Sequence, residues 1–231
     1  MAHMAWAFRV GIIGGTGAEG RGLALRFAQA GVSVVIGSRD PQRAEESAAA
    51  LAEQMAISDR FARPRGAANT VAAASAEFVF LAVPFTHAAE TLSDCAAVLQ
   101  SGSVVVDVTV PLVFTPGQKQ VQVIDLPEGS GSGHLAGHIP TGVDLVATFK
   151  TLPAHLLSHP EEPLDCDEFV CGNSPEARRR VVALLGTLPG LRPVDIGGLE
   201  AAATLERMCA LAVSINRHYK VKGSRFRVIG L

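Results

Sequence analysis

The chain of 231 residues has little of what nucleic-acid-binding and membrane-spanning proteins need. Aromatic residues make up only 5% of it, with one Trp and one Tyr, so few side chains are available for stacking on unpaired bases. The formal net charge is −2, which provides no basic surface for a polyanion. No apolar run approaches the roughly 18 residues of a membrane span. The composition therefore argues against nucleic-acid and membrane partners.

Cysteine is scarce as well. The four cysteines form neither a CxxC pair nor a zinc-binding spacing; they are Cys95, Cys166, Cys171 and Cys209. We expect reduced thiols in a cytoplasmic protein.

Two histidine pairs have the i, i+4 spacing that places side chains on one helix face, namely His134 with His138 and His155 with His159. Neither pair has a third ligand at a fixed spacing, so we expect no metal site. We interpret these histidines as polar surface or capping residues. Alternatively, His155 lines a substrate slot.

The composition is otherwise that of a protein with a sizeable core, at 48% hydrophobic and 18% charged residues. Apolar runs of strand length, at 8–13, 32–36, 78–83 and 103–108, alternate with helical patterns. Nearly unbroken apolar strands are typical of a parallel sheet covered on both faces. The sequence predicts an α/β fold, a Rossmann-type doubly wound parallel sheet.

Helix signals support this pattern. Residues 19–30 read as a helix that Gly31 stops, and 41–55 as a helix with Asp40 as N-cap and Pro41 at its first position. Between 109 and 133 the alternation fails, and "GSGSG" (129–133) reads as a mobile loop or a plain surface connection. Beyond it we expect strands at 143–149, 169–171 and within "LRPVDIGG", a helix at 175–185 capped by Ser174, and a long helix at 199–216.

The segment "GGTGAEG" carries the first chemical signal. Gly15, Gly17 and Gly20 form G-x-G-x-x-G between an apolar strand and a helix, with a second strand following. The glycines allow a tight turn and close approach of pyrophosphate, and the helix N-terminus offers free N–H groups to phosphates. The segment predicts dinucleotide binding. A tight strand-to-helix turn without a ligand is the alternative.

The end of the second strand indicates which dinucleotide. An NAD site usually has an acid there to bind the ribose 2′-hydroxyl, but this chain has Ser38 and Arg39, with Arg43 four residues further on. A hydroxyl and two guanidinium groups suit a 2′-phosphate, so we expect NADP. Two solvated arginines are the alternative. A small shift in register would instead make Asp40 a ribose ligand.

Four segments together resemble the NADPH-dependent coenzyme F420 reductases, also called F420H2:NADP oxidoreductases. They are "GGTGAEGRGLALRFAQAG", "VVIGSRDPQRAEE", "LAVPFTHAAET" and "GLRPVDIGGLE". The resemblance runs from about residue 8 to 200 and is weaker between 112 and 143. It implies hydride transfer between NADP and a 5-deazaflavin, coenzyme F420, within a homodimer.

The resemblance also implies which residues bind the cofactor. Matching the pyrophosphate stretch are Thr16, Gly17, Ala18 and Glu19. Matching the 2′-phosphate site are Ser38, Arg39 and Arg43. Matching further contacts beside the cofactor are Val83 and His87 in "VPFTH", Val110 before a proline, and Ala154 in "TLPA".

One position departs from the family. Lys150 stands in "FKTLPA" where many members have His. It either holds an anionic ring or carboxylate or is an ordinary surface lysine. The hydride acceptor therefore stays open: the alternatives are an NADP-dependent reductase of another small acceptor (an imine, a ketone or a flavin-like molecule) and a non-catalytic NADP-binding redox sensor.

Acid–base machinery is not evident in the sequence. The chain has no Tyr-x-x-x-Lys and no G-x-S-x-G, and no catalytic residue is identified. Direct hydride transfer between two carriers needs mainly proximity and a dry slot.

We expect two domains. Residues 5–148 form the NADP-binding Rossmann domain, and residues 149–231 form a small, mainly helical C-terminal domain with the substrate slot and the dimer contacts. Its long helix has apolar residues at helical spacing, which pack on the core or on a second subunit: Leu205, Met208, Leu211 and Ile215. The basic tail, with Arg225 and Arg227, is either solvated or attracts the anionic tail of a deazaflavin.

Overall fold

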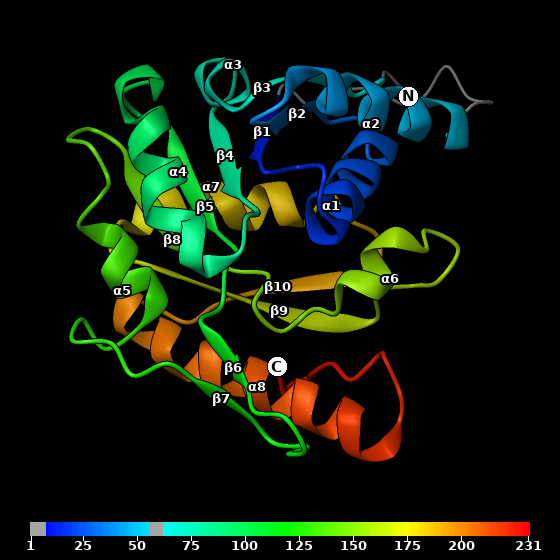
Figure 1. Ribbon diagram of the computed structural model, residues 1–231, viewed down its shortest axis with the longest axis vertical. Helices are drawn as coiled ribbons and strands as arrows, with labels where there is room; N and C mark the ends of the chain where they lie inside the picture. Colours follow the sequence, from blue (N-terminus) through cyan, green and yellow to red (C-terminus); the bar gives the residue numbers. More distant parts are fainter. Residues whose placement is uncertain (1–7, 56–61) are drawn as a thin grey trace.

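The protein is built on one eight-stranded sheet with helices on both faces (Figure 1). The computed structural model describes residues 8–55 and 62–231. The strand order is β10-β9-β8-β5-β4-β1-β2-β3, and a separate antiparallel pair is formed by β6 and β7. The predicted Rossmann-type α/β fold is confirmed.

The strands of the large sheet are β1 (Arg9–Ile13), β2 (Ser33–Ser38), β3 (Arg65–Ala68), β4 (Phe78–Leu81), β5 (Val104–Asp107), β8 (Asp144–Ala147), β9 (Cys166–Gly172) and β10 (Leu191–Asp195). The small pair is β6 (Leu112–Phe114) and β7 (Val121–Val123). The α-helices are α1 (Ala18–Gln29), α2 (Pro41–Gln54), α3 (Asn69–Ala74), α4 (Ala88–Cys95), α5 (Gly131–Ala136), α6 (Ala154–Ser158), α7 (Pro175–Leu185) and α8 (Ala202–Tyr219), with 3₁₀ turns at Phe85–His87, Ala96–Val98 and Leu199–Ala201.

The sheet is parallel from β3 to β8, and β9 then runs antiparallel to β8. The chain builds β2 and β3 on one side of β1 and then crosses to place β4 on the other side. This reversal creates a topological switch point between the carboxyl ends of β1 and β4. Ligands of open α/β sheets bind at such points.

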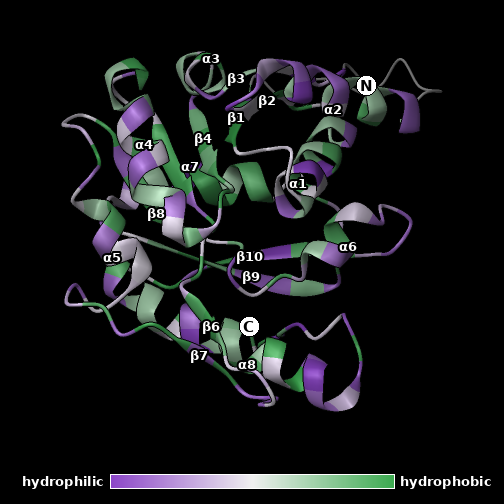
Figure 2. Cartoon of the chain, viewed as in Figure 1, coloured by the Kyte–Doolittle hydropathy of each residue, from purple (hydrophilic) through white to green (hydrophobic). Residues whose placement is uncertain are grey.

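Side-chain alternation divides the core between the two faces. Val10 and Ile12 of β1 join the core on the face covered by α1, α2, α6 and α7. Ile13 joins the core under α3, α4, α5 and α8. The central strand β4 is uniformly hydrophobic in Figure 2, while α4 carries bands of both colours. Strands covered on both faces are expected to read as unbroken apolar runs.

The structure contains the capping interactions that the sequence predicts at the helix ends. The Asp40 Oδ1 atom accepts a hydrogen bond from the Gln42 N–H at 3.0 Å, and Pro41 opens α2. The Ser174 hydroxyl accepts from the Ala177 N–H at 3.2 Å at the start of α7. Gly31 has a φ of +82° directly after α1, a conformation that glycine adopts without steric cost.

The alternation does fail at residues 109–133, where the β6–β7 hairpin stands apart from the large sheet. The interpretation of "GSGSG" as a mobile loop or a plain surface connection was wrong, because the segment opens α5 with Ser130 as its N-cap. Ser130 and Ser132 are buried. The segment at 169–171 is the middle of the seven-residue strand β9, and β3 was not expected.

The chain on both sides of residue 148 contributes to the large sheet, because β9 and β10 extend it beyond β8. Of the predicted face of α8, Leu205 is buried in the core, whereas Leu211 is 52% exposed. The helix therefore packs on the core through Leu205 and leaves Leu211 exposed.

A single arginine ties α1 to the segment that follows β8. The buried Arg26 guanidinium donates hydrogen bonds to backbone carbonyls of α6 and the turn after it, among them those of Leu157 at 3.3 Å, His159 at 2.8 Å and Glu162 at 2.9 Å. Burial is the main cause that lowers the pKa of Arg26, against the opposing effect of two nearby glutamates. The contacts hold α6 against the first helix.

Candidate functional site

The glycine loop lies at the switch point and ends in the first turn of α1. Gly14 has a φ of +71°, and a Cβ built there would lie 2.3 Å from Val83 Cγ1. A Cβ on Gly20 would lie 2.5 Å from the Gly15 Cα. Both positions therefore require glycine. The Asn69 Oδ1 atom accepts from the Gly14 N–H at 3.1 Å and fixes the loop from α3.

The start of α1 is suited to bind an anion. Gly17 is the N-cap, so no side chain caps the first turn, and Gly17 itself is exposed. A helix begins with N–H groups that have no partner within the helix, and its dipole favours negative charge. The first turn thus fits the pyrophosphate of a dinucleotide.

A cavity of about 480 Å³ opens at the end of β2; we call it the outer cavity. Ser38, Arg39 and Arg43 line it, and neither guanidinium is paired with a carboxylate in the described part of the chain. Asp40 also lines it, but its Oδ1 atom caps α2, and its N–H donates to the Ser38 hydroxyl at 3.2 Å. The guanidinium groups of both arginines are therefore available to bind an anionic ligand.

A second cavity of about 440 Å³, the inner cavity, continues from the first. The two share Gly17, Ala82, Val83 and Pro84. The inner cavity runs past the ends of β4 and β5 to α8, where Ala212 and Val213 form part of its wall. One trough therefore extends from the end of β2 to the C-terminal helix.

All eleven residues predicted to bind the cofactor line this trough. In the outer cavity lie Thr16, Ser38, Arg39, Arg43 and His87; in the inner cavity lie Ala18, Glu19, Val110 and Ala154; in both lie Gly17 and Val83. The fold brings together residues from 16 to 154, as the resemblance requires. Their contacts with a ligand stay a prediction.

Lys150 is not a surface lysine, because it is only 2% exposed. The preceding residue, Phe149, has a φ of +54°, which is rare for an aromatic residue. Its ring packs between those of Phe27 and Phe80, with centroids 6.4 and 6.0 Å away. With this ring anchored in the core, the left-handed turn directs Lys150 inward to the floor of the inner cavity.

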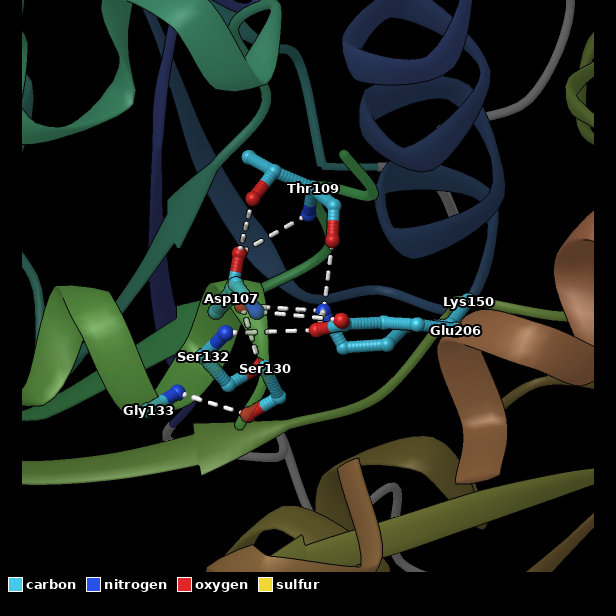
Figure 3. A network of polar contacts seen from close by, with 8 residues as sticks. Asp107, Thr109, Ser130, Ser132, Gly133, Lys150 and Glu206 are labelled. Atoms are coloured by element: carbon cyan, nitrogen blue, oxygen red, sulfur yellow. Dashed lines mark hydrogen bonds and ion pairs between the residues drawn. The ribbon is translucent and has the colours of Figure 1, made fainter. Parts of the chain in front are cut away.

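The Lys150 ammonium group lies in a buried ion cluster, which we define as Asp107, Lys150 and Glu206 (Figure 3). Its Nζ atom is 2.9 Å from Asp107 Oδ2 and 3.6 Å from Glu206 Oε1, and it donates to the Thr109 carbonyl at 2.5 Å. Burial alone would lower the pKa of Lys150, but attraction to the two carboxylates outweighs it and raises the pKa. Lys150 is therefore protonated, and its ammonium group is bound to other residues of the protein.

The remaining oxygens of the cluster are also satisfied. Asp107 accepts from the hydroxyl groups of Thr109 at 2.7 Å and Ser132 at 2.6 Å. Glu206 accepts from the N–H groups of Gly131 at 3.0 Å and Ser132 at 3.2 Å, at the start of α5 (Figure 3). The segment "GSGSG" thus binds a carboxylate of α8.

Two further acids lie near the cluster. Burial is the main cause that raises the pKa of Glu168 to about 8, although the Thr151 hydroxyl donates to it at 3.3 Å. Burial likewise raises the pKa of Glu19 to about 8. The thiol of Cys209, also on the inner cavity, has its pKa raised to about 12 by burial. The floor of the inner cavity thus disfavours additional negative charge.

The sequence analysis missed Asn69, Asp107, Ser132 and Glu206. Only Asp107 gave a local signal, as an acid ending an otherwise apolar buried strand.

His155 is not among the residues that line the inner cavity. No group of three or more His, Cys, Asp or Glu side chains in residues 8–55 and 62–231 could hold a metal ion. Within the same residues, no helix is both long and apolar enough to cross a bilayer.

The basic tail pairs with the sheet edge. Arg227 lies 2.8 Å from Asp165 Oδ1, and Arg225 donates to the Asp165 carbonyl at 3.3 Å. Asp167 is bonded by Arg192 at 2.6 Å, which is the main cause that lowers the pKa of Asp167. These contacts favour the solvated-edge interpretation of the tail.

Replacing Lys150 with Met is expected to leave two carboxylates buried without their cation. We predict a loss of about 3–5 kcal/mol in the free energy of unfolding, the usual effect of breaking a buried ion pair. Urea denaturation at pH 7.5 measures it. The exposed Lys119→Met is the control and should change stability by less than about 0.5 kcal/mol. Equal stabilities of the two variants would show that the cluster contributes nothing.

The comparisons with known proteins agree with this geometry. Residues 9–111 match the family model described as NADP oxidoreductase coenzyme F420-dependent. The chain is 35% identical to the F420-dependent NADP reductase of Methanothermobacter thermautotrophicus, over 96% of this chain and 95% of that protein. It is 32% identical to the reductase of the same name from Methanocaldococcus jannaschii, over 96% and 99%.

A solved structure shares the fold. It is described as a putative F420-dependent NADP reductase from Arthrobacter sp. FB24, with a TM-score of 0.80 and 24% identity, covering 96% of this chain and 99% of that one. From the agreement along almost the whole of both archaeal sequences, we conclude that this chain belongs to the family of coenzyme F420-dependent NADP oxidoreductases.

Proposed function

We propose that this protein transfers a hydride between NADP(H) and a 5-deazaflavin coenzyme of the F420 type. The single observation that carries the proposal is the continuous trough, with two guanidinium groups at one end that pair with no described carboxylate and a mostly apolar inner cavity at the other. The names of the two archaeal relatives support the same pair of reactants.

The residues of the trough fit NADP. The uncapped first turn of α1 would bind the pyrophosphate, and Ser38, Arg39 and Arg43 would bind the 2′-phosphate. The nicotinamide would then extend past Val83 into the inner cavity. When bound, the nicotinamide supplies the hydride chemistry, while the chain supplies orientation and exclusion of water.

The inner cavity supports a carrier as the second reactant. Most of its lining is aliphatic or backbone, and its lysine is already paired with Asp107 and Glu206. A direct transfer between two rings needs such a dry slot more than it needs an acid–base pair. We therefore place the deazaflavin here in preference to a ketone or imine.

Steady-state kinetics with NADPH and a panel of acceptors test the function. We expect turnover with coenzyme F420 and rates at least about 100-fold lower with free flavin, an imine or a ketone. Preferred turnover of an imine or ketone would favour the small-acceptor reductase. Tight NADPH binding without turnover of any acceptor would favour the redox sensor.

The cofactor preference is tested by Arg39→Ala. A charge-assisted hydrogen bond contributes about 1.5–3 kcal/mol, so the KM for NADPH should rise about 10- to 100-fold. The KM for NADH should hardly change, because NADH carries no 2′-phosphate. The exposed Lys119→Ala is the control. An equal change for both nucleotides would count against a 2′-phosphate site at Arg39.

We also propose a homodimer that uses the exposed apolar face of α8. Leu211 is 52% exposed beside Ile124 of the hairpin region, and Phe114 is 58% exposed. In this arrangement residues 149–231 supply one side of the substrate slot and most contacts between subunits, and residues 5–148 bind NADP and supply the other side of the slot. The four free thiols are consistent with a cytoplasmic protein.

Light scattering tests the dimer. The wild-type protein should have twice the 24.1 kDa mass of one chain, and Leu211→Asp should shift it to the mass of one chain because it buries a charge in the interface. Val71→Asp, at a residue 54% exposed on α3, is the matched control and should stay dimeric. A wild-type protein of one chain's mass would refute the dimer.

A further inference from the structure

The inner cavity is lined by three side chains that titrate or carry charge, and they differ in what they are free to do. They are Glu19 from α1, Lys150 from the segment after β8, and Cys209 from α8. Lys150 is committed to Asp107, Glu206 and the Thr109 carbonyl. The thiol of Cys209, with its pKa raised to about 12, keeps its proton throughout the neutral range.

Glu19 is different because no hydrogen bond or ion pair joins its carboxyl to another described residue. Its Oε1 atom is buried without a partner, although the residue itself is only partly buried. A buried carboxylate oxygen without a donor is costly. The first turn of α1 is also where we place the pyrophosphate, whose negative charge would repel a carboxylate. Both conditions favour the neutral, protonated form.

The titratable groups around Glu19 come from β5, β9, α8 and the segment after β8. The neighbouring acids Glu168 of β9 and Asp107 of β5 oppose its ionisation, and Lys150 favours it. From α8, the neighbouring groups are Cys209, whose own ionisation Glu19 opposes, and Glu206, which is already bound to Lys150 and to α5. Lys150, the one cation among these described groups, is thus already paired with two other carboxylates.

We propose that Glu19 is the proton donor and acceptor that balances hydride transfer in the inner cavity. The proposal rests on the function proposed above. Reduction of a deazaflavin by NADPH adds one hydride and one proton to the acceptor, so a proton must come from outside the nicotinamide. Among the described residues that line this cavity, Glu19 is the one with a carboxyl group, and no described donor binds its Oε1 atom.

The step balances as follows. The C–H bond of the reduced nicotinamide breaks, and its electron pair goes with the hydride to the acceptor ring. The O–H bond of the Glu19 carboxyl breaks, and its proton goes to a ring nitrogen or oxygen of the acceptor. A carboxylate forms, and water restores its proton before the next turnover. In the reverse direction the carboxylate accepts the proton.

The acidity of Glu19 suits both directions. Burial raises its pKa to about 8, and a general acid–base group works best with a pKa near the operating pH. The carboxyl is protonated below this value and loses its proton as the pH rises through it. The rate of deazaflavin reduction should therefore fall as the pH rises past about 8.

Glu19→Gln tests the proposal, because glutamine has the same size but carries no titratable proton. We expect kcat for deazaflavin reduction to fall about 100-fold, in line with the loss of a general acid, and the loss of activity with rising pH to disappear. The exposed Glu53→Gln should behave as wild type. A Glu19→Gln variant with the wild-type kcat and pH profile would overturn the proposal.

A second measurement does not depend on turnover. Infrared difference spectra of the free protein between pH 6 and pH 10 should show the C=O band of a protonated carboxyl that disappears around pH 8. The band should be smaller by one carboxyl in Glu19→Gln. If the two proteins have identical spectra, Glu19 is not protonated and the proposal fails. If the spectra differ but the wild-type protein does not reduce the deazaflavin, the proposed function fails instead.

Discussion

The ion cluster of Asp107, Lys150 and Glu206 is the constraint on which the rest of the site depends. It joins the carboxyl end of β5, the segment after β8 and the helix α8, and the start of α5 completes it. One ammonium group must face two carboxylates in a site closed to water, and a buried pair is stable only when its remaining hydrogen bonds are made. The requirement is consistent with the left-handed conformation of Phe149 and with the burial of Ser130 and Ser132.

The trough follows from the order of the strands. Since β4 lies on the opposite side of β1 from β2, the loops after these strands separate and leave a continuous depression. The outer cavity has Arg39 and Arg43 on its wall, while the inner cavity reaches α8 and lies over the ion cluster, whose ammonium group is paired with two carboxylates. The two ends of the trough thus differ in electrostatic character.

The sequence predicted those strands and helix ends whose structure is determined by residues close to them in the chain. The unbroken apolar strands, the cap at Asp40 and the stop at Gly31 were all predictable because each follows from neighbouring residues. The "GSGSG" helix was not, since its stability depends on Glu206, about 75 residues away. Lys150 was ambiguous for the same reason: a lysine after a strand is usually exposed, and its partners are distant in the sequence. Asn69, which holds the glycine loop from α3, has no motif at all.

The bonds from Arg26 to the backbone of α6 and the following turn have a mechanical consequence. They join α1 to the segment around Ala154, which lines one side of the inner cavity. The opposite wall is formed by α8, which accepts a hydrogen bond at its Ser214 hydroxyl from the Val121 N–H of the β6–β7 hairpin. We expect any widening of the inner cavity to take place at the α8 wall, on the helix whose outer face we propose as a contact with a second subunit.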